Sequence, residues 1–285
     1  MIPNRGRVAP FFLLTFAITW GLQVPGVLAL RGLLPGDPRF YVPFAGLGML
    51  GPAVAAVVLT HREGGRAGVK ALLAPLLRWR VHPGVYALAL LPALALTLLL
   101  YLLNLAGRHG PVAYLPTTGG VVFGVFASVV EELGWRGYAL PRLQKRWGGF
   151  AASGLLGAVW YAWHLPMFTA VGVPLNLALV MLLYFTGASL LLTRLVNASG
   201  GSLLVAVVGH LAAHLNNSHR ALPLEVVPLV AHAVIYAALG LALMRRAALP
   251  PGPKLRRDTS RGPSVYFNKY ATEVSSFSSS SDQSP

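Results

Sequence analysis

The chain has 285 residues, of which 55% are hydrophobic and only 11% are charged, and its mean hydropathy is +0.62. This composition indicates a protein that crosses a membrane several times and excludes an ordinary soluble domain. The net charge of +15 would suit nucleic acid, but the basic residues cluster in short segments between apolar runs, as in oriented membrane proteins. We therefore expect a lipid bilayer, and no nucleic acid, as a partner. The absence of cysteine excludes disulfides and thiol catalysis.

Eight apolar runs, taken in chain order, predict an all-α fold with about eight transmembrane helices. Arg5 and Arg7 precede the first run as in a signal peptide, but the run is too long and lacks a clear cleavage site, so we expect it to remain as the first helix. The runs cover residues 8–30, 40–60, 84–105, 119–140, 149–171, 175–196, 203–215 and 226–244.

These runs divide the chain into four parts. Residues 1–117 hold the first three transmembrane helices and a basic, amphipathic segment near residues 62–80, which we expect to lie on the membrane surface. Residues 118–218 form a core in which charged and histidine side chains occur inside apolar runs. Residues 219–250 hold the last transmembrane helix, and residues 251–285 form a basic, then serine-rich tail that we expect to be disordered.

The distribution of basic residues predicts the orientation. With the N-terminus inside, the inner segments hold 18 of the 23 basic residues, the outer segments hold 4, and Arg136 remains in the membrane. Because positive loops stay in the cytoplasm, both termini are expected to be cytoplasmic. Arginine far outnumbers lysine, which suggests the coding bias of a GC-rich bacterium. We thus expect a multi-pass protein of a bacterial inner (plasma) membrane.

Two adjacent glutamates, Glu131 and Glu132, and Arg136 lie inside the fourth apolar run. A charge at that depth costs about 2.5 kcal/mol or more unless it is paired or faces a wet cavity, so such residues indicate a functional site. In a regular helix Arg136 lies roughly 40° from Glu132 and roughly 140° from Glu131. This predicts a Glu132–Arg136 ion pair and leaves Glu131 unpaired, as a candidate general base. The alternative is that all three only tie helices together.

Histidines on two further runs reach a similar depth. Counted from the cytoplasmic ends of their helices, Glu131, His164 and His210 lie roughly 13, 20 and 13 Å deep, near the middle of a membrane about 30 Å thick. A shared cavity is therefore expected, although His164 alone would more often be structural. His210 and His214 lie four residues apart on one helical face, a spacing that suits a metal ion. The alternative places His214 near a wet helix end.

Three motifs in this order resemble those of the CAAX protease and bacteriocin-processing (CPBP, or Abi) family of intramembrane proteases. Glu131-Glu132-x-x-x-Arg136 matches the first motif. Trp160-x-x-x-His164 stands where the family has Phe-x-x-x-His. His210 matches the third motif, but the Asn or Asp expected four residues later is His214 here. The resemblance covers about residues 118–218.

The resemblance implies an eight-helix membrane endopeptidase with an intramembrane catalytic cavity. Its substrate would be a membrane-associated protein or peptide, as in the eukaryotic relatives that trim prenylated CAAX proteins. In the family's scheme Glu131 would be the general base, His164 its partner in activating water, and His210 an oxyanion donor. Glu132 and Arg136 would brace the site, while His214 leaves the fourth role in doubt.

Metal dependence and overall function leave alternatives open. No cofactor is expected, because the chain has no His-Glu-x-x-His motif; the alternative is zinc held by His164, His210 and His214. A transporter or channel would also use intramembrane glutamate and histidine, but the sequence shows no internal repeats. The second alternative is a family member that has lost activity and serves as an immunity-type membrane factor, because the motif departs at position 214.

Overall fold

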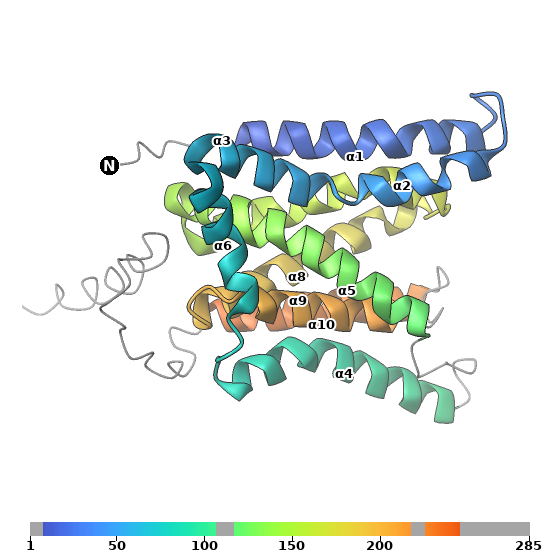
Figure 1. Cartoon of the computed structure of the whole chain (residues 1–285). Helices are drawn as coiled ribbons and strands as arrows, with labels where there is room; N and C mark the ends of the chain where they lie inside the picture. The colour runs from blue at the N-terminus through green and yellow to red at the C-terminus, as the bar shows by residue number, and fades with distance from the viewer. Residues whose placement is uncertain (1–7, 107–116, 218–225, 246–285) are drawn as a thin grey trace, which may run out of the picture.

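The computed structural model describes residues 8–106, 117–217 and 226–245, and every regular element within these ranges is a helix (Figure 1). The predicted all-α fold is therefore confirmed, whereas the predicted tail at residues 251–285 lies outside the described residues. The elements are α1 (Ala9–Leu30), η1 (Pro38–Tyr41), α2 (Val42–Gly48), α3 (Gly51–Leu73), η2 (Ala74–Leu77), α4 (Pro83–Leu105), α5 (Thr118–Glu132), η3 (Leu133–Ala139), α6 (Leu140–Trp163), α7 (Leu165–Ala170), η4 (Leu175–Leu177), α8 (Ala178–Ala198), α9 (Leu203–Asn217) and α10 (Val226–Arg245).

Each of the eight predicted apolar runs contains helix. By length and hydropathy α1, α4 and α8 are each able to cross a membrane, and residues Pro38–Gly48 with Gly51–Leu77 form either a broken span or a re-entrant loop, with a bend of 42° between them. Helices α9 and α10 are apolar but shorter. The protein is thus an all-α polytopic membrane protein, and the count of eight crossings stays a prediction. Helix α1 begins, and α10 ends, at the same end of the bundle (Figure 1).

The predicted surface segment begins at a kink in α3. Gly65 has a φ of 57°, a left-handed conformation that glycine adopts without steric cost. After this kink the chain runs crosswise to the other helices and reaches the start of α4 (Figure 1). Two of its large apolar side chains face outward, with Leu77 81% and Trp79 63% exposed, whereas Leu72 packs into the core. A basic segment that presents tryptophan and leucine outward fits the predicted place at a membrane surface.

Side-chain hydrogen bonds attach the bend in α3 to η3 and α6. Glu63 accepts hydrogen bonds from the Tyr138 hydroxyl at 2.6 Å and from the Arg142 guanidinium. The Arg142 guanidinium also lies 3.5 Å from the centre of the Tyr138 ring. These contacts therefore fix α3 against the η3–α6 junction, next to the segment that carries the predicted site.

Close helix packing brings α6, α8 and α10 together. A Cβ atom on Gly157 of α6 would lie 2.6 Å from the Cα of Thr186, and one on Gly187 of α8 would lie 2.5 Å from the Cα of Ala237. Small residues let membrane helices approach this closely. This close packing of α6 on α8 brings side chains of both helices to the wall of one cavity.

Candidate functional site

The acidic pair lies where α5 gives way to a wider helix. Helix α5 ends at Glu132, and Leu133–Ala139 forms a π-helix, so the predicted regular α-helical rotation through Arg136 is wrong. Gly134 lies in the widened turn, where a Cβ would come 2.5 Å from the Cβ of Pro52. Without a side chain there, the turn packs directly onto α3. Such π-bulges are frequent at functional sites.

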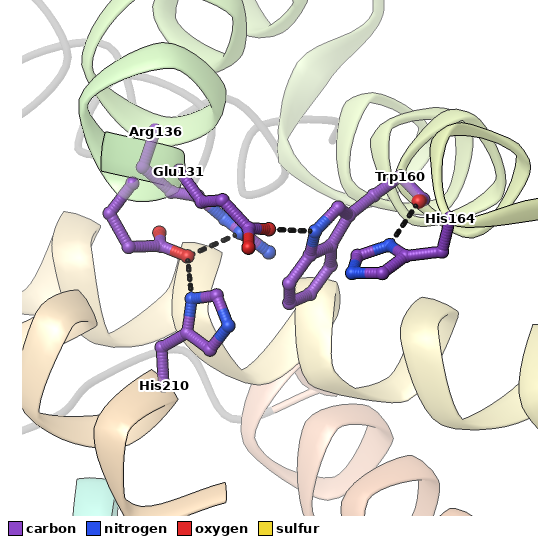
Figure 2. Close-up of polar contacts among 6 residues, drawn as sticks. Glu131, Arg136, Trp160, His164 and His210 are labelled. Atoms are coloured by element: carbon purple, nitrogen blue, oxygen red, sulfur yellow. Dashed lines mark hydrogen bonds and ion pairs between the residues drawn. The ribbon is translucent and has the colours of Figure 1, made fainter. Parts of the chain in front are cut away.

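Glu132 is the centre of a buried ion-pair network. Its Oε1 atom accepts a hydrogen bond from Arg136 at 2.8 Å, so the predicted ion pair is confirmed. The same oxygen lies 2.9 Å from Nδ1 of His210 on α9 (Figure 2). Glu132 and Arg136 are fully buried and His210 is nearly so. Pairing of this kind is what makes a buried charge tolerable, because breaking it strands the partner.

Glu131 is buried and points away from this network toward α6. Its Oε2 atom accepts a hydrogen bond from the Trp160 indole at 2.7 Å (Figure 2). The prediction that Glu131 lacks an intrahelical partner holds, but the expectation of an unpaired carboxylate is wrong, because α6 supplies the indole. The indole ring also lies under the Arg136 guanidinium, 4.5 Å from ring centre to carbon. Trp160 therefore orients both the carboxylate and the arginine.

His164 ends α6 beside Trp160. Its Nδ1 atom lies 2.9 Å from the Trp160 carbonyl oxygen (Figure 2). A carbonyl only accepts hydrogen bonds, so Nδ1 carries the proton, and Nε2 of the neutral ring offers a lone pair. The Phe185 ring lies 4.6 Å from the His164 ring and holds it in place. His164 can thus accept a proton from a water molecule.

Three of the predicted histidines line one cavity. A space of about 100 Å³ lies between α6, α8 and α9 and is bordered by His164, His210 and His214, together with Trp160 and Tyr184. A larger, mostly apolar groove of about 440 Å³ adjoins it between α1, α2 and α7, and His164 and Met167 border both spaces. The three histidines border the small cavity, Glu131 lies behind Trp160 and does not border it, and the groove offers room for an apolar chain.

His214 lies inside the site, not at a wet helix end. Its ring stacks on that of His210, with centroids 4.8 Å apart and planes 17° apart. Its Nε2 atom is buried and has no hydrogen-bond partner within the described residues. The ring therefore offers a lone pair or a proton to a group bound beside His210.

The described residues also bring together one group that fits a metal ion. One carboxylate oxygen of Glu131 and one ring nitrogen each of His210 and His214 lie within 4.8 Å of one another, whereas His164 does not belong to this group. Two histidines and a carboxylate form a common zinc set. Glu132 contacts Nδ1 of His210, and Trp160 donates a hydrogen bond to Oε2 of Glu131. Residues that contact metal ligands in this way commonly orient them. The unpartnered nitrogen of His214 fits this reading too.

The comparisons with known proteins agree on one family. Residues 113–219 match the family described as type II CAAX prenyl endopeptidase Rce1-like, and this segment contains all six predicted site residues. Over this segment the chain is similar to that family. It is also similar to CAAX prenyl protease 2 of Methanococcus maripaludis, with 28% identity over 173 residues. That match covers 55% of this chain and 61% of the length of the relative.

The roles of two residues at the site were not predicted from the sequence. Tyr184 borders the cavity from α8, but it belongs to none of the three CPBP motifs. Trp160 entered the sequence analysis only as the first residue of the second motif, yet it donates to Glu131 and its carbonyl accepts from His164. The substitution of tryptophan for phenylalanine in the second CPBP motif was the signal, because only the indole carries a polar N–H group.

Proposed function

We propose that the protein is an intramembrane endopeptidase that hydrolyses a peptide bond of a membrane-associated protein or peptide. The observation that carries this proposal is the buried carboxylate of Glu131, held by the Trp160 indole at 2.7 Å within a segment that matches a prenyl endopeptidase family. Three histidines border the cavity, and Glu131 contacts Trp160 in its wall; glutamate and histidine are side chains that serve in general base catalysis.

In the proposed reaction Glu131 takes a proton from water, and His164 accepts a hydrogen bond from the same water through Nε2. The water oxygen bonds to the carbonyl carbon, and the carbonyl oxygen becomes an anion. When this intermediate collapses, the C–N bond breaks and the leaving nitrogen takes the proton from Glu131. Water is thereby divided between the two products. Were zinc held by Glu131, His210 and His214, it would supply Lewis-acid activation of the water.

The apolar groove indicates the class of substrate. It is bordered mainly by apolar side chains of α1, α2 and α7, and His164 borders both this groove and the small cavity. An apolar peptide or lipid-modified chain in the groove would place its neighbouring peptide bond at the small cavity. A prenylated peptide that carries a CAAX-type end is therefore the first probe, in keeping with the relative in Methanococcus maripaludis.

Membrane proteomics tests the proposal in the native setting. Cells that carry the wild-type protein are compared with cells that carry Glu131→Gln, which keeps the shape of the side chain and removes the proton acceptor. Glu63→Gln serves as the matched control, because Glu63 lies outside both spaces. We expect at least one membrane peptide that is cut in wild-type and control cells but intact with Glu131→Gln. Identical peptide patterns in all three would contradict the proposal.

A further inference from the structure

The proposed hydrolysis needs a hydrogen-bond donor for the carbonyl oxygen as it becomes an anion, and the cavity has few donors to spare. Donors aimed at a developing oxyanion supply one of the largest contributions to catalysis. The Trp160 indole N–H is used by Glu131. In their neutral forms, the ring N–H of His164 points to a carbonyl and that of His210 points to Glu132. Both rings then present only a lone pair to the cavity.

His214 belongs to the side of the site where water is activated. One of its ring nitrogens lies within 4.8 Å of both a Glu131 oxygen and a His210 nitrogen. A proton on that nitrogen would be drawn to the Glu131 carboxylate, because a carboxylate is the stronger acceptor. His214 is thus a poorer candidate for the donor to the carbonyl oxygen.

Tyr184 is the remaining side-chain donor on the cavity wall. Apart from the indole and the three histidines, the residues that border the cavity carry no side-chain N–H or O–H group; they are Met167, Phe168, Met181, Phe185 and Ala213. Tyr184 is only 7% exposed, and within the described part of the chain no hydrogen bond engages its hydroxyl. A phenol has a proton to donate in any rotamer of its O–H bond.

The ring of Tyr184 is fixed on the side away from the cavity. The His232 ring lies 4.4 Å from it, and the Tyr236 ring lies 5.2 Å away in an edge-on arrangement. Both partners belong to α10, which packs on α8 through Gly187. A donor held on a rigid helix needs little reorganisation when charge develops on the substrate, which is the condition for strong stabilisation.

We propose that Tyr184 is a catalytic residue of this protein that donates its hydroxyl proton in a hydrogen bond to the substrate carbonyl oxygen. This inference rests on the proposed peptidase function. It replaces the role that the CPBP family resemblance implied for His210, whose Nδ1–H group is bound to Glu132. It also explains how the site dispenses with the Asn or Asp at position 214, since the donor comes from α8 and not from α9.

The test compares Tyr184→Phe with Tyr236→Phe in the purified full-length chain. Both changes remove one buried hydroxyl from the same aromatic cluster, but only Tyr184 borders the cavity. The probe is an internally quenched, prenylated CAAX-type peptide. We expect Tyr184→Phe to lower kcat about 100- to 1000-fold with little change in KM, and Tyr236→Phe to keep the wild-type rate.

A binding measurement separates catalysis from structure. A phosphinic peptide, whose tetrahedral anion imitates the intermediate, should bind Tyr184→Phe more weakly by the same factor as kcat/KM falls. The uncleaved probe should bind equally to Glu131→Gln and to Glu131→Gln with Tyr184→Phe. If Tyr184→Phe does not fold, Tyr184→Met fills the space with a flexible side chain and carries the same expectation.

The outcomes distinguish this inference from the function on which it rests. Wild-type kcat in Tyr184→Phe, with cleavage by the wild-type protein, would overturn the role of Tyr184 and leave the peptidase function standing. A fall in kcat with unchanged binding of the phosphinic peptide would overturn it as well. No hydrolysis by the wild-type protein, neither of the probe nor of any membrane peptide, would overturn the function and the inference together.

Discussion

The Nδ1 atom of His210 lies 2.9 Å from Oε1 of Glu132, the oxygen that also accepts a hydrogen bond from Arg136. This arrangement links α9 to the π-helical turn after α5, and it fixes which ring nitrogen of His210 faces the cavity. Glu132 therefore acts through its partners: it holds a cation and an imidazole in place while its neighbour Glu131 accepts a hydrogen bond from Trp160, which borders the cavity.

Replacing Glu132 by glutamine is expected to damage stability first. The change removes the negative charge from a network in which Arg136 is fully buried, and an unpaired buried charge costs about 3–5 kcal/mol. We expect a lower midpoint of thermal unfolding in detergent, with loss of activity as a consequence. Glu63→Gln, whose partner Arg142 is part-exposed, should cost far less. Equal midpoints for wild type and Glu132→Gln would show that the network does not hold the fold.

Two glycines on α6 provide a matched test of the α6–α8 contact. Gly157→Ala would push a methyl group to 2.6 Å from the Thr186 Cα atom, so we expect helix separation, destabilisation by about 1–3 kcal/mol and reduced turnover. Gly154→Ala meets no atom within 4 Å and should be neutral or stabilising by about 0.5–1 kcal/mol, because alanine favours helix. Unfolding midpoints and turnover of both variants check this. A Gly157→Ala protein that behaves like Gly154→Ala would contradict the packing argument.

Substitution of His214 tests whether the site binds a metal ion. We expect a metal-free site, in which His214→Asn keeps most activity and chelators have no effect. The purified wild-type protein should then contain less than one zinc per chain by elemental analysis. Stoichiometric zinc that is lost in His214→Asn, together with activity that a chelator abolishes and zinc restores, would establish the Glu131–His210–His214 group as a metal centre and contradict this expectation.

Most of the fold and part of the site could be predicted from composition and local spacing. The long apolar runs predicted the helices because a membrane admits little else, and the four-residue spacing predicted the Glu132–Arg136 pair. The similar depth of Glu131, His164 and His210 predicted a common cavity; His164 and His210 do border one, whereas Glu131 is not among the residues that line it. These features depend on residues close in sequence or on the thickness of the bilayer.

Contacts between helices that are distant in the sequence could not be predicted from it. The Trp160–Glu131 hydrogen bond joins residues 29 positions apart, and the Glu132–His210 contact joins residues 78 positions apart. Nothing in the pattern fixed the rotation of α8 that brings Tyr184 to the cavity. The π-helix was missed for a related reason, since the close approach of Gly134 to Pro52 is a tertiary contact that overrides the regular helical period.

The most direct measurement is the hydrolysis of the quenched prenylated peptide by purified wild-type protein and by Glu131→Gln in the same bilayer. The account predicts that the wild-type protein cleaves the probe and that Glu131→Gln, although folded with an unchanged unfolding midpoint, loses at least about 100-fold in kcat, because general base catalysis is removed. Product masses identify the bond that is cut. Cleavage by Glu131→Gln at the wild-type rate would contradict the assignment of Glu131 as the base that activates water.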